Sequence, residues 1–153
     1  AMEIHSEEML KSQARRIEHY PQLRERVERH LVETREQQAM LAQCLKQLGA
    51  EPSAFKELGA RFAALGQGLF QVTSPDEIVK GAITTSAFEH MEITVYRALA
   101  AAAKAAGEGD VERICTTILP QEQAMAAWLD EHLPELVEQY MARVELPDVS
   151  AKR

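Results

Sequence analysis

The amino-acid sequence predicts an all-α protein, a single bundle of four long helices. Aromatic residues make up only 5% of the 153 residues, and strong helix formers greatly outnumber β-branched residues. Apolar residues also recur every three or four positions along four segments, which proline or glycine residues separate. This length suits one domain with a real core, which we place over residues 1–146, followed by a frayed tail over residues 147–153.

The first two predicted helices are divided by a proline. The first runs from the start of the chain to about Glu18, because Pro21 disfavours a helical conformation in the residue before it. The second runs from Pro21 to Leu48, and Gly49 suits the position that ends a helix.

The third and fourth predicted helices follow after a long interval. The third begins after an N-cap at Ser74 and continues to about Ala106. The fourth follows a glycine-containing turn and should kink at Pro120. Pro134 is expected to end or bend it, before a short extra C-terminal helix over Glu135–Val144.

The lengths of the connections predict the topology. Tight turns join the first helix to the second and the third to the fourth, so each pair forms an antiparallel hairpin. The second and third helices are separated by residues 49–74, which hold only a short helix-like piece at about Ser53–Leu65. Two tight turns and one long middle crossover are the connectivity of a ferritin-like four-helix bundle.

Each predicted helix carries at least one glutamate on the stripe predicted to face inward. At about 1.5 Å per residue, the acids of each hairpin lie within roughly 8 Å of one another along the bundle axis. Four carboxylates balance the charge of two divalent ions, and inward glutamates hold two metal ions in ferritin-like bundles. The alternative for any single glutamate is an edge residue whose carboxylate reaches water. The predicted metal ligands are Glu3, Glu33, Glu89, Glu92 and Glu122.

The histidine expected in a two-iron bundle is missing from its usual place. The common motif is Glu-x-x-His, but the residue three after Glu33 is Glu36, and the residue three after Glu122 is Met125. His30 lies one turn before Glu33 on the same face, so His30 and Glu36 are further candidate ligands. Carboxylates with some imidazole suit iron or manganese.

Four other side chains have two interpretations each. Tyr96, one turn after the acids of the third helix, is predicted to hydrogen-bond a ligand carboxylate, or else to be a core tyrosine. His90 is predicted to bond a neighbouring helix, with metal ligation as the alternative. Cys44 and Cys115 lie at apolar spacings and are interpreted as buried thiols rather than redox-active groups.

The charge balance excludes some classes of partner. The net charge is −7 and no basic cluster is present, which argues against nucleic-acid binding. We find no apolar run of membrane length and no signal peptide, so we expect a cytoplasmic protein that does not bind membranes.

Two stretches resemble a known bacterial family. HLVETREQQAMLAQCLKQLGAEP and AITTSAFEHMEITVYRALAAAAKAAG are similar to the YciF/YciE family of stress-associated ferritin-like proteins. The resemblance implies a homodimer with a rubrerythrin-like core and a di-metal centre, with Gln37, His90 and Tyr96 beside the metal ligands. The family's acid in the first helix falls on Glu3, whereas one of its two fourth-helix acids is replaced by Gln121. The matching residues are His30, Leu31, Glu33, Thr34, Gln37, Glu89, His90, Glu92, Ile93 and Tyr96.

These observations lead to two functional hypotheses. The first is a di-iron or di-manganese protein of stress protection, whose substrate is a small oxidant or a metal ion. If it is an enzyme, we expect oxidation of iron by oxygen or peroxide, with no catalytic residue assigned. The second is a metal-free bundle that acts as a stress-induced dimeric structural or interaction module. In that case Glu89 and Glu92 would bond across helices, partly protonated.

Overall fold

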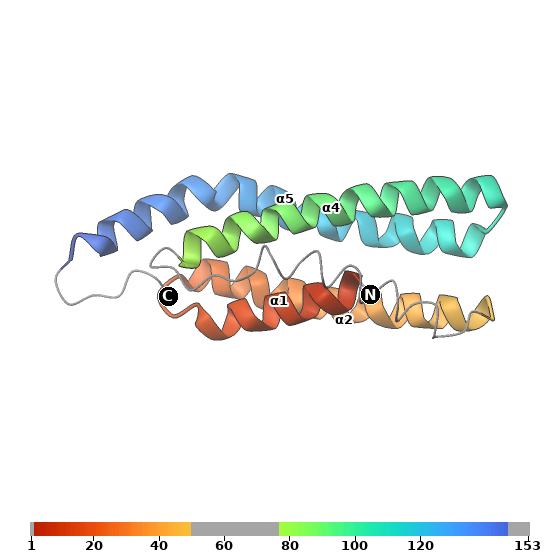
Figure 1. Cartoon of the computed structure of the whole chain (residues 1–153), viewed down its shortest axis with the longest axis horizontal. Helices are drawn as coiled ribbons and strands as arrows, with labels where there is room; N and C mark the ends of the chain where they lie inside the picture. Colours follow the sequence, from red (N-terminus) through yellow and green to blue (C-terminus); the bar gives the residue numbers. More distant parts are fainter. Residues whose placement is uncertain (1, 50–76, 147–153) are drawn as a thin grey trace.

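The computed structural model of the chain describes residues 2–49 and 77–146. These residues form helices and no strand, so the all-α prediction is confirmed (Figure 1). The helices are α1 (Met2–Arg16), α2 (Pro21–Gln47), α4 (Glu77–Ala106) and α5 (Gly109–Val144).

Two helical hairpins pack against each other, as Figure 1 shows. A short turn before Pro21 joins α1 to α2, and Gly107 and Glu108 join α4 to α5. Gly107 has φ 76° and Gly49, after α2, has φ 65°, a left-handed conformation that glycine adopts without steric cost. The predicted tight turns and the predicted glycine after the second helix are therefore confirmed.

Helices α2 and α4 run in the same direction, so α2 ends and α4 begins at opposite ends of the bundle (Figure 1). This is the arrangement that the ferritin-like connectivity requires. The predicted crossover itself lies outside the described residues. So do the helix-like piece at Ser53–Leu65 and the N-cap at Ser74.

Helix α5 is longer than the sequence predicted. It continues from Gly109 to Val144 with Pro120 and Pro134 inside it, so the expected extra C-terminal helix is the last part of α5. Proline removes one backbone hydrogen bond, but the buried Leu136 packs into the core just after Pro134 and favours continuation. This part of α5 extends beyond the start of α4 in Figure 1. Helix α1 ends at Arg16, two residues earlier than expected.

Within residues 2–49 and 77–146, the core consists of two apolar clusters with a polar layer between them. Along α2, Val27 belongs to the first cluster and Met40 packs against the second. Along α5, Met125 belongs to the first cluster and Ile118 to the second. The polar residues buried between these levels are His30, Thr34, Gln37 and Glu122.

None of the helices in residues 2–49 and 77–146 combines the length and the apolar character that crossing a membrane requires.

Candidate metal centre

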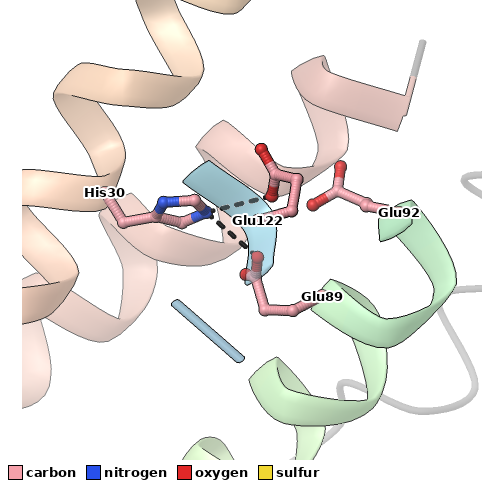
Figure 2. Close-up of side chains that lie close together, drawn as sticks. All are labelled: His30, Glu89, Glu92 and Glu122. Atoms are coloured by element: carbon pink, nitrogen blue, oxygen red, sulfur yellow. Dashed lines mark ion pairs between the residues drawn. The ribbon is translucent and has the colours of Figure 1, made fainter. Parts of the chain in front are cut away.

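Four fully buried side chains from three helices converge in the polar layer. His30 comes from α2, Glu89 and Glu92 from α4, and Glu122 from α5, and each has a relative exposure of 0%. One ligand atom from each residue lies within 4.8 Å of the corresponding atoms of the other three. Figure 2 shows the three carboxylates and the imidazole pointing toward one another. We call these four residues the ligand cluster.

His30 contacts carboxylates through both ring nitrogens. Nε2 lies 3.1 Å from Glu89 Oε2 and 3.3 Å from Glu122 Oε2 (Figure 2), while Nδ1 lies 2.7 Å from Glu33 Oε2. Burial disfavours the imidazolium charge, but the bonds to Glu122, Glu33 and Glu89 outweigh it and raise the pKa of His30 to about 12. Without metal, His30 is therefore a cation among the acids. Its Nε2 faces Glu89 and Glu122, so a metal ion bound among these residues would replace the proton on Nε2.

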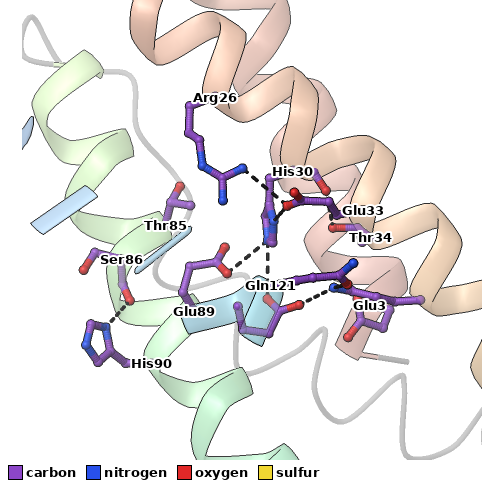
Figure 3. Close-up of polar contacts among 12 residues, drawn as sticks. Glu3, Arg26, His30, Glu33, Thr34, Thr85, Ser86, Glu89, His90 and Gln121 are labelled. Atoms are coloured by element: carbon purple, nitrogen blue, oxygen red, sulfur yellow. Dashed lines mark hydrogen bonds and ion pairs between the residues drawn. The ribbon is translucent and has the colours of Figure 1, made fainter. Parts of the chain in front are cut away.

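Glu33 lies on the opposite side of the His30 ring from the three acids of the ligand cluster. Its side chain has 25% relative exposure, and its Oε2 also accepts a hydrogen bond from Arg26 Nη1 at 3.3 Å. Figure 3 shows this chain from Arg26 through Glu33 to His30. Burial raises the pKa of Glu33, but the bond to His30 and the Arg26 charge lower it more, so the net shift is downward. The geometry makes Glu33 a group that orients His30.

Glu3 brings a fourth buried carboxylate to the polar layer. It lies in the first turn of α1 with 3% relative exposure, and the hydroxyl of Tyr96 donates a hydrogen bond to its Oε1. Burial raises the pKa of Glu3 to about 7, the Tyr96 bond opposes this, and the Glu122 charge adds to it. Burial also raises the pKa of the Tyr96 hydroxyl, as does the Glu3 charge. Tyr96 therefore hydrogen-bonds a candidate ligand carboxylate, which was the first of the two interpretations of this residue.

The three acids of the ligand cluster differ in their protonation. Burial raises the pKa of Glu89 to about 8, partly offset by His30, and raises the pKa of Glu92 well above 4.5, with the Glu3 and Glu89 charges adding to it. Glu122 has the opposite net shift. Burial raises its pKa, but bonds with His30, Glu89 and Gln37 lower it more.

Gln37 fixes the position of Glu122. Its Nε2 donates to Glu122 Oε1 at 2.5 Å and to Gln121 Oε1 at 2.9 Å. Gln121, labelled in Figure 3, therefore places an amide beside Glu122. The YciF/YciE family has a second acid at this position. An amide donor holds one carboxylate oxygen and leaves Glu122 Oε2 facing the ligand cluster.

The donor set fits a metal ion. Neither carboxylate oxygen of Glu92, nor Glu3 Oε2, has a hydrogen-bond partner among the described residues, although all three atoms are buried. A buried polar atom without a partner costs free energy, and a cation among these oxygens removes that cost. Carboxylate oxygens with one imidazole nitrogen are the donors that iron and manganese favour in such sites.

Two further predicted candidates, besides Glu33, lie away from the ligand cluster. Glu36 is exposed on α2, so the structure does not bring it to the other acids. His90 is also exposed. Its Nδ1 contacts the Ser86 carbonyl oxygen at 2.9 Å (Figure 3), and its Nε2 lies 3.8 Å from Asp130 of α5. His90 thus contacts the neighbouring helix, as predicted.

One functional neighbour was missed by sequence reasoning. Arg26 is a buried arginine with 6% relative exposure that holds Glu33. Its position seven residues before Glu33, about two turns of helix, is the signal that would have revealed the pair. Cys44 and Cys115 are buried free thiols, as predicted.

Comparison with known proteins identifies the family. Residues 1–142 match the family model described as "Domain of unknown function (DUF892)". A crystal structure of a protein (XCC3681) from Xanthomonas campestris pv. campestris is 40% identical in sequence, with a TM-score of 0.78. That match covers 95% of this chain and 90% of the Xanthomonas chain. The chain therefore belongs to the DUF892 family.

Proposed function

We propose that this protein is a ferritin-like metalloprotein with a carboxylate-rich centre for two iron or manganese ions. The observation that carries the proposal is the ligand cluster, whose four ligand atoms lie within 4.8 Å of one another. Its Glu92 oxygens have no hydrogen-bond partner among the described residues. A structural polar cluster would be expected to pair those oxygens.

The residues divide between the two proposed ions. His30, Glu89, Glu92 and Glu122 would hold the first ion through the atoms that already face one another. Glu3, which interacts electrostatically with Glu92 and Glu122, would contribute a carboxylate to the second ion. Four carboxylates balance the four positive charges of two divalent ions. Bound iron or manganese supplies one-electron redox chemistry at this position.

The protein's own groups prepare the site for that chemistry. Glu33 accepts a hydrogen bond from Nδ1–H of His30 and so keeps Nε2 directed at the acids of the ligand cluster. Gln37 holds one oxygen of Glu122. The apolar clusters on both sides of the polar layer exclude water, which strengthens the electrostatic interactions within it. His30, Glu89 and Glu92 would release their protons when they take up a metal ion.

The resemblance to YciF/YciE proteins supports a finer proposal about role. According to this finer proposal, the protein is a cytoplasmic homodimer that acts in oxidative or general stress protection. Its reaction is the oxidation of ferrous iron by oxygen or peroxide, so the substrate is a metal ion or a small oxidant. The rival function is a metal-free dimeric interaction module. In the rival, protonated acids and the His30 cation neutralise the polar layer.

Metal analysis of protein purified without chelator separates the two functions. We expect close to two ions per chain, and after chelation we expect the same number to rebind in an anaerobic titration with ferrous iron or manganese. Glu92→Gln should lose most of this binding. Glu36→Gln is the matched control, because Glu36 is an exposed glutamate on α2, and it should bind as the unmodified protein does. No bound metal, together with identical titrations for both variants, would establish the metal-free alternative.

A further inference from the structure

Two buried thiols lie outside the proposed metal centre. Cys44 of α2 has 5% relative exposure and Cys115 of α5 has 1%. Helices α2 and α5 run in opposite directions (Figure 1), and Gln37 of α2 contacts Glu122 of α5 at 2.5 Å. Cys44 follows Gln37 by seven residues, about two turns, along α2. Cys115 precedes Glu122 by seven residues along α5. In antiparallel helices these two steps lead to the same level.

Packing around Cys115 supports this register. Met40 and Leu41, in the turn of α2 just before Cys44, pack against the apolar cluster that contains Cys115. Burial raises the pKa of the Cys115 thiol, and the interaction with the Cys44 thiol raises it further. The register therefore brings Cys44 and Cys115 to the same level of the α2–α5 contact, where their thiols interact electrostatically.

We propose that Cys44 and Cys115 are a redox pair, which hydrogen peroxide converts into a disulfide between α2 and α5. The Cys44 thiolate attacks one oxygen of peroxide, because burial raises the pKa of the Cys115 thiol and so disfavours the Cys115 thiolate. An S–O bond forms, the O–O bond breaks, and the released hydroxide takes a proton to give water. The Cys115 thiol then loses its proton and attacks the Cys44 sulfur. An S–S bond forms, the S–O bond breaks, and a second water leaves.

The disulfide joins the two hairpins of the bundle. Cys44 belongs to the α1–α2 hairpin and Cys115 to the α4–α5 hairpin. The bond lies two helical turns, about 10 Å, from the level of Glu122, so it fixes the spacing of the helices that supply His30 and Glu122. The chemistry needs only peroxide and the two thiols, and it does not depend on the proposed metal.

The test uses the full chain, reduced and then freed of metal with a chelator, so that iron cannot produce radicals. The protein is treated with hydrogen peroxide, quenched, and alkylated with N-ethylmaleimide in denaturant. Mass spectrometry without reductant should show the loss of two hydrogen atoms and no added maleimide. Proteolysis should give one peptide pair linking α2 to α5, and dithiothreitol should restore two alkylatable thiols.

Cys44→Ser and Cys115→Ser are the matched variants. Each should gain one maleimide after peroxide treatment, or oxygen atoms at the remaining cysteine, and neither should form the linked peptides. The measurement on the unmodified chain does not depend on the folding of either variant. The proposal is overturned if native protein keeps two alkylatable thiols under peroxide. It is also overturned if oxygen adds to one cysteine while the other stays free, or if the disulfide joins separate chains.

Discussion

Glu33 holds His30 from outside the ligand cluster, with its Oε2 atom 2.7 Å from Nδ1 of the imidazole. This bond places a proton on Nδ1 and leaves Nε2 to face Glu89 and Glu122. A carboxylate that bonds the outer nitrogen of a ligand histidine fixes the ring and increases its basicity. The buried Arg26 holds Glu33 in turn, so α2 carries its own orienting chain of three residues.

Replacing Glu33 should weaken metal binding without abolishing it. In Glu33→Gln the imidazole loses its charged acceptor, and affinity should fall roughly 10- to 100-fold. Arg26 also loses its ion-pair partner, which should cost about 1–3 kcal/mol of unfolding free energy. Competition with a chelating dye measures affinity, and chemical denaturation measures stability. Glu36→Gln should change neither. Complete loss of one ion in Glu33→Gln would instead make Glu33 a direct ligand.

Glu89→Gln tests whether the cluster is built for metal or for structure. We expect lower metal content, while the unfolding free energy of the metal-free variant at pH 7 stays within about 1 kcal/mol of the parent. The reason is that burial already raises the pKa of Glu89 to about 8, so the neutral amide resembles the protonated acid. Thermal melting with and without chelator, plus metal analysis, gives both values. Full metal content with a large loss of stability in chelator would favour the structural role.

Much of the fold follows from patterns in the sequence. Helix-forming composition and the spacing of apolar residues identify four helices, and short connections at Pro21 and Gly107 identify the hairpins. The sequence left open whether the helix ends or only bends at Pro134, and the continuation of α5 did not follow from it. Sequence rules count the lost backbone hydrogen bond, whereas the outcome also depends on tertiary packing, here the burial of Leu136.

The site could be predicted as a layer but not atom by atom. Helical periodicity places Glu33 and His30 on one face of α2, but it does not say which side chain reaches the centre. That choice depends on Arg26, which holds Glu33 back, and on the acids opposite, which attract His30. Periodicity also leaves Glu36 undecided, because a residue three positions from Glu33 can lie at the edge of the stripe or outside it.

Tyr96→Phe should affect stability more than metal content. The change removes the hydrogen bond that the hydroxyl donates to the buried carboxylate of Glu3. We expect a loss of about 1–2 kcal/mol in the metal-free protein, since a buried acceptor loses its partner. The Glu3 pKa should rise further, because the Tyr96 bond is what lowers it.

Chemical denaturation at pH 7 and metal analysis of Tyr96→Phe give the two quantities. Tyr140→Phe is the matched control, because Tyr140 is only partly buried near the end of α5 and is not part of the polar layer. Loss of metal without loss of stability would make the hydroxyl a direct metal ligand.

The metal-free protein should become less stable as the pH rises from 5 to 8. Burial raises the folded pKa of Glu3 from 4.5 to about 7 and that of Glu89 from 4.5 to about 8, and it raises the pKa of Glu92 well above 4.5. Between the unfolded and folded values the folded state binds more protons. The unfolding free energy therefore falls with rising pH, by up to about 1.4 kcal/mol per pH unit for each such proton.

His30 acts in the same direction, and the remaining acids do not oppose it in this range. The pKa of His30 rises from 6.5 to about 12, so its stabilisation is complete below pH 6.5 and diminishes above it. Glu33 and Glu122 have lowered pKa values, so their stabilisation is lost only as the pH falls below 4.5. Burial lowers the pKa of His5 below 6.5, so the contribution of His5 increases as the pH rises toward 6.5 and offsets part of this trend.

Bound metal should reverse this trend, because the metal replaces the protons and binds more tightly as they leave. Thermal melting of the chelated and the metal-loaded protein at pH 5, 6, 7 and 8 should give melting temperatures that fall in the first case and level off or rise in the second. Glu92→Gln removes one titrating group and should flatten the chelated profile. Glu36→Gln should leave both profiles unchanged. If the chelated protein is equally stable across the range, the acids of the ligand cluster ionise normally, and burial does not raise their pKa values.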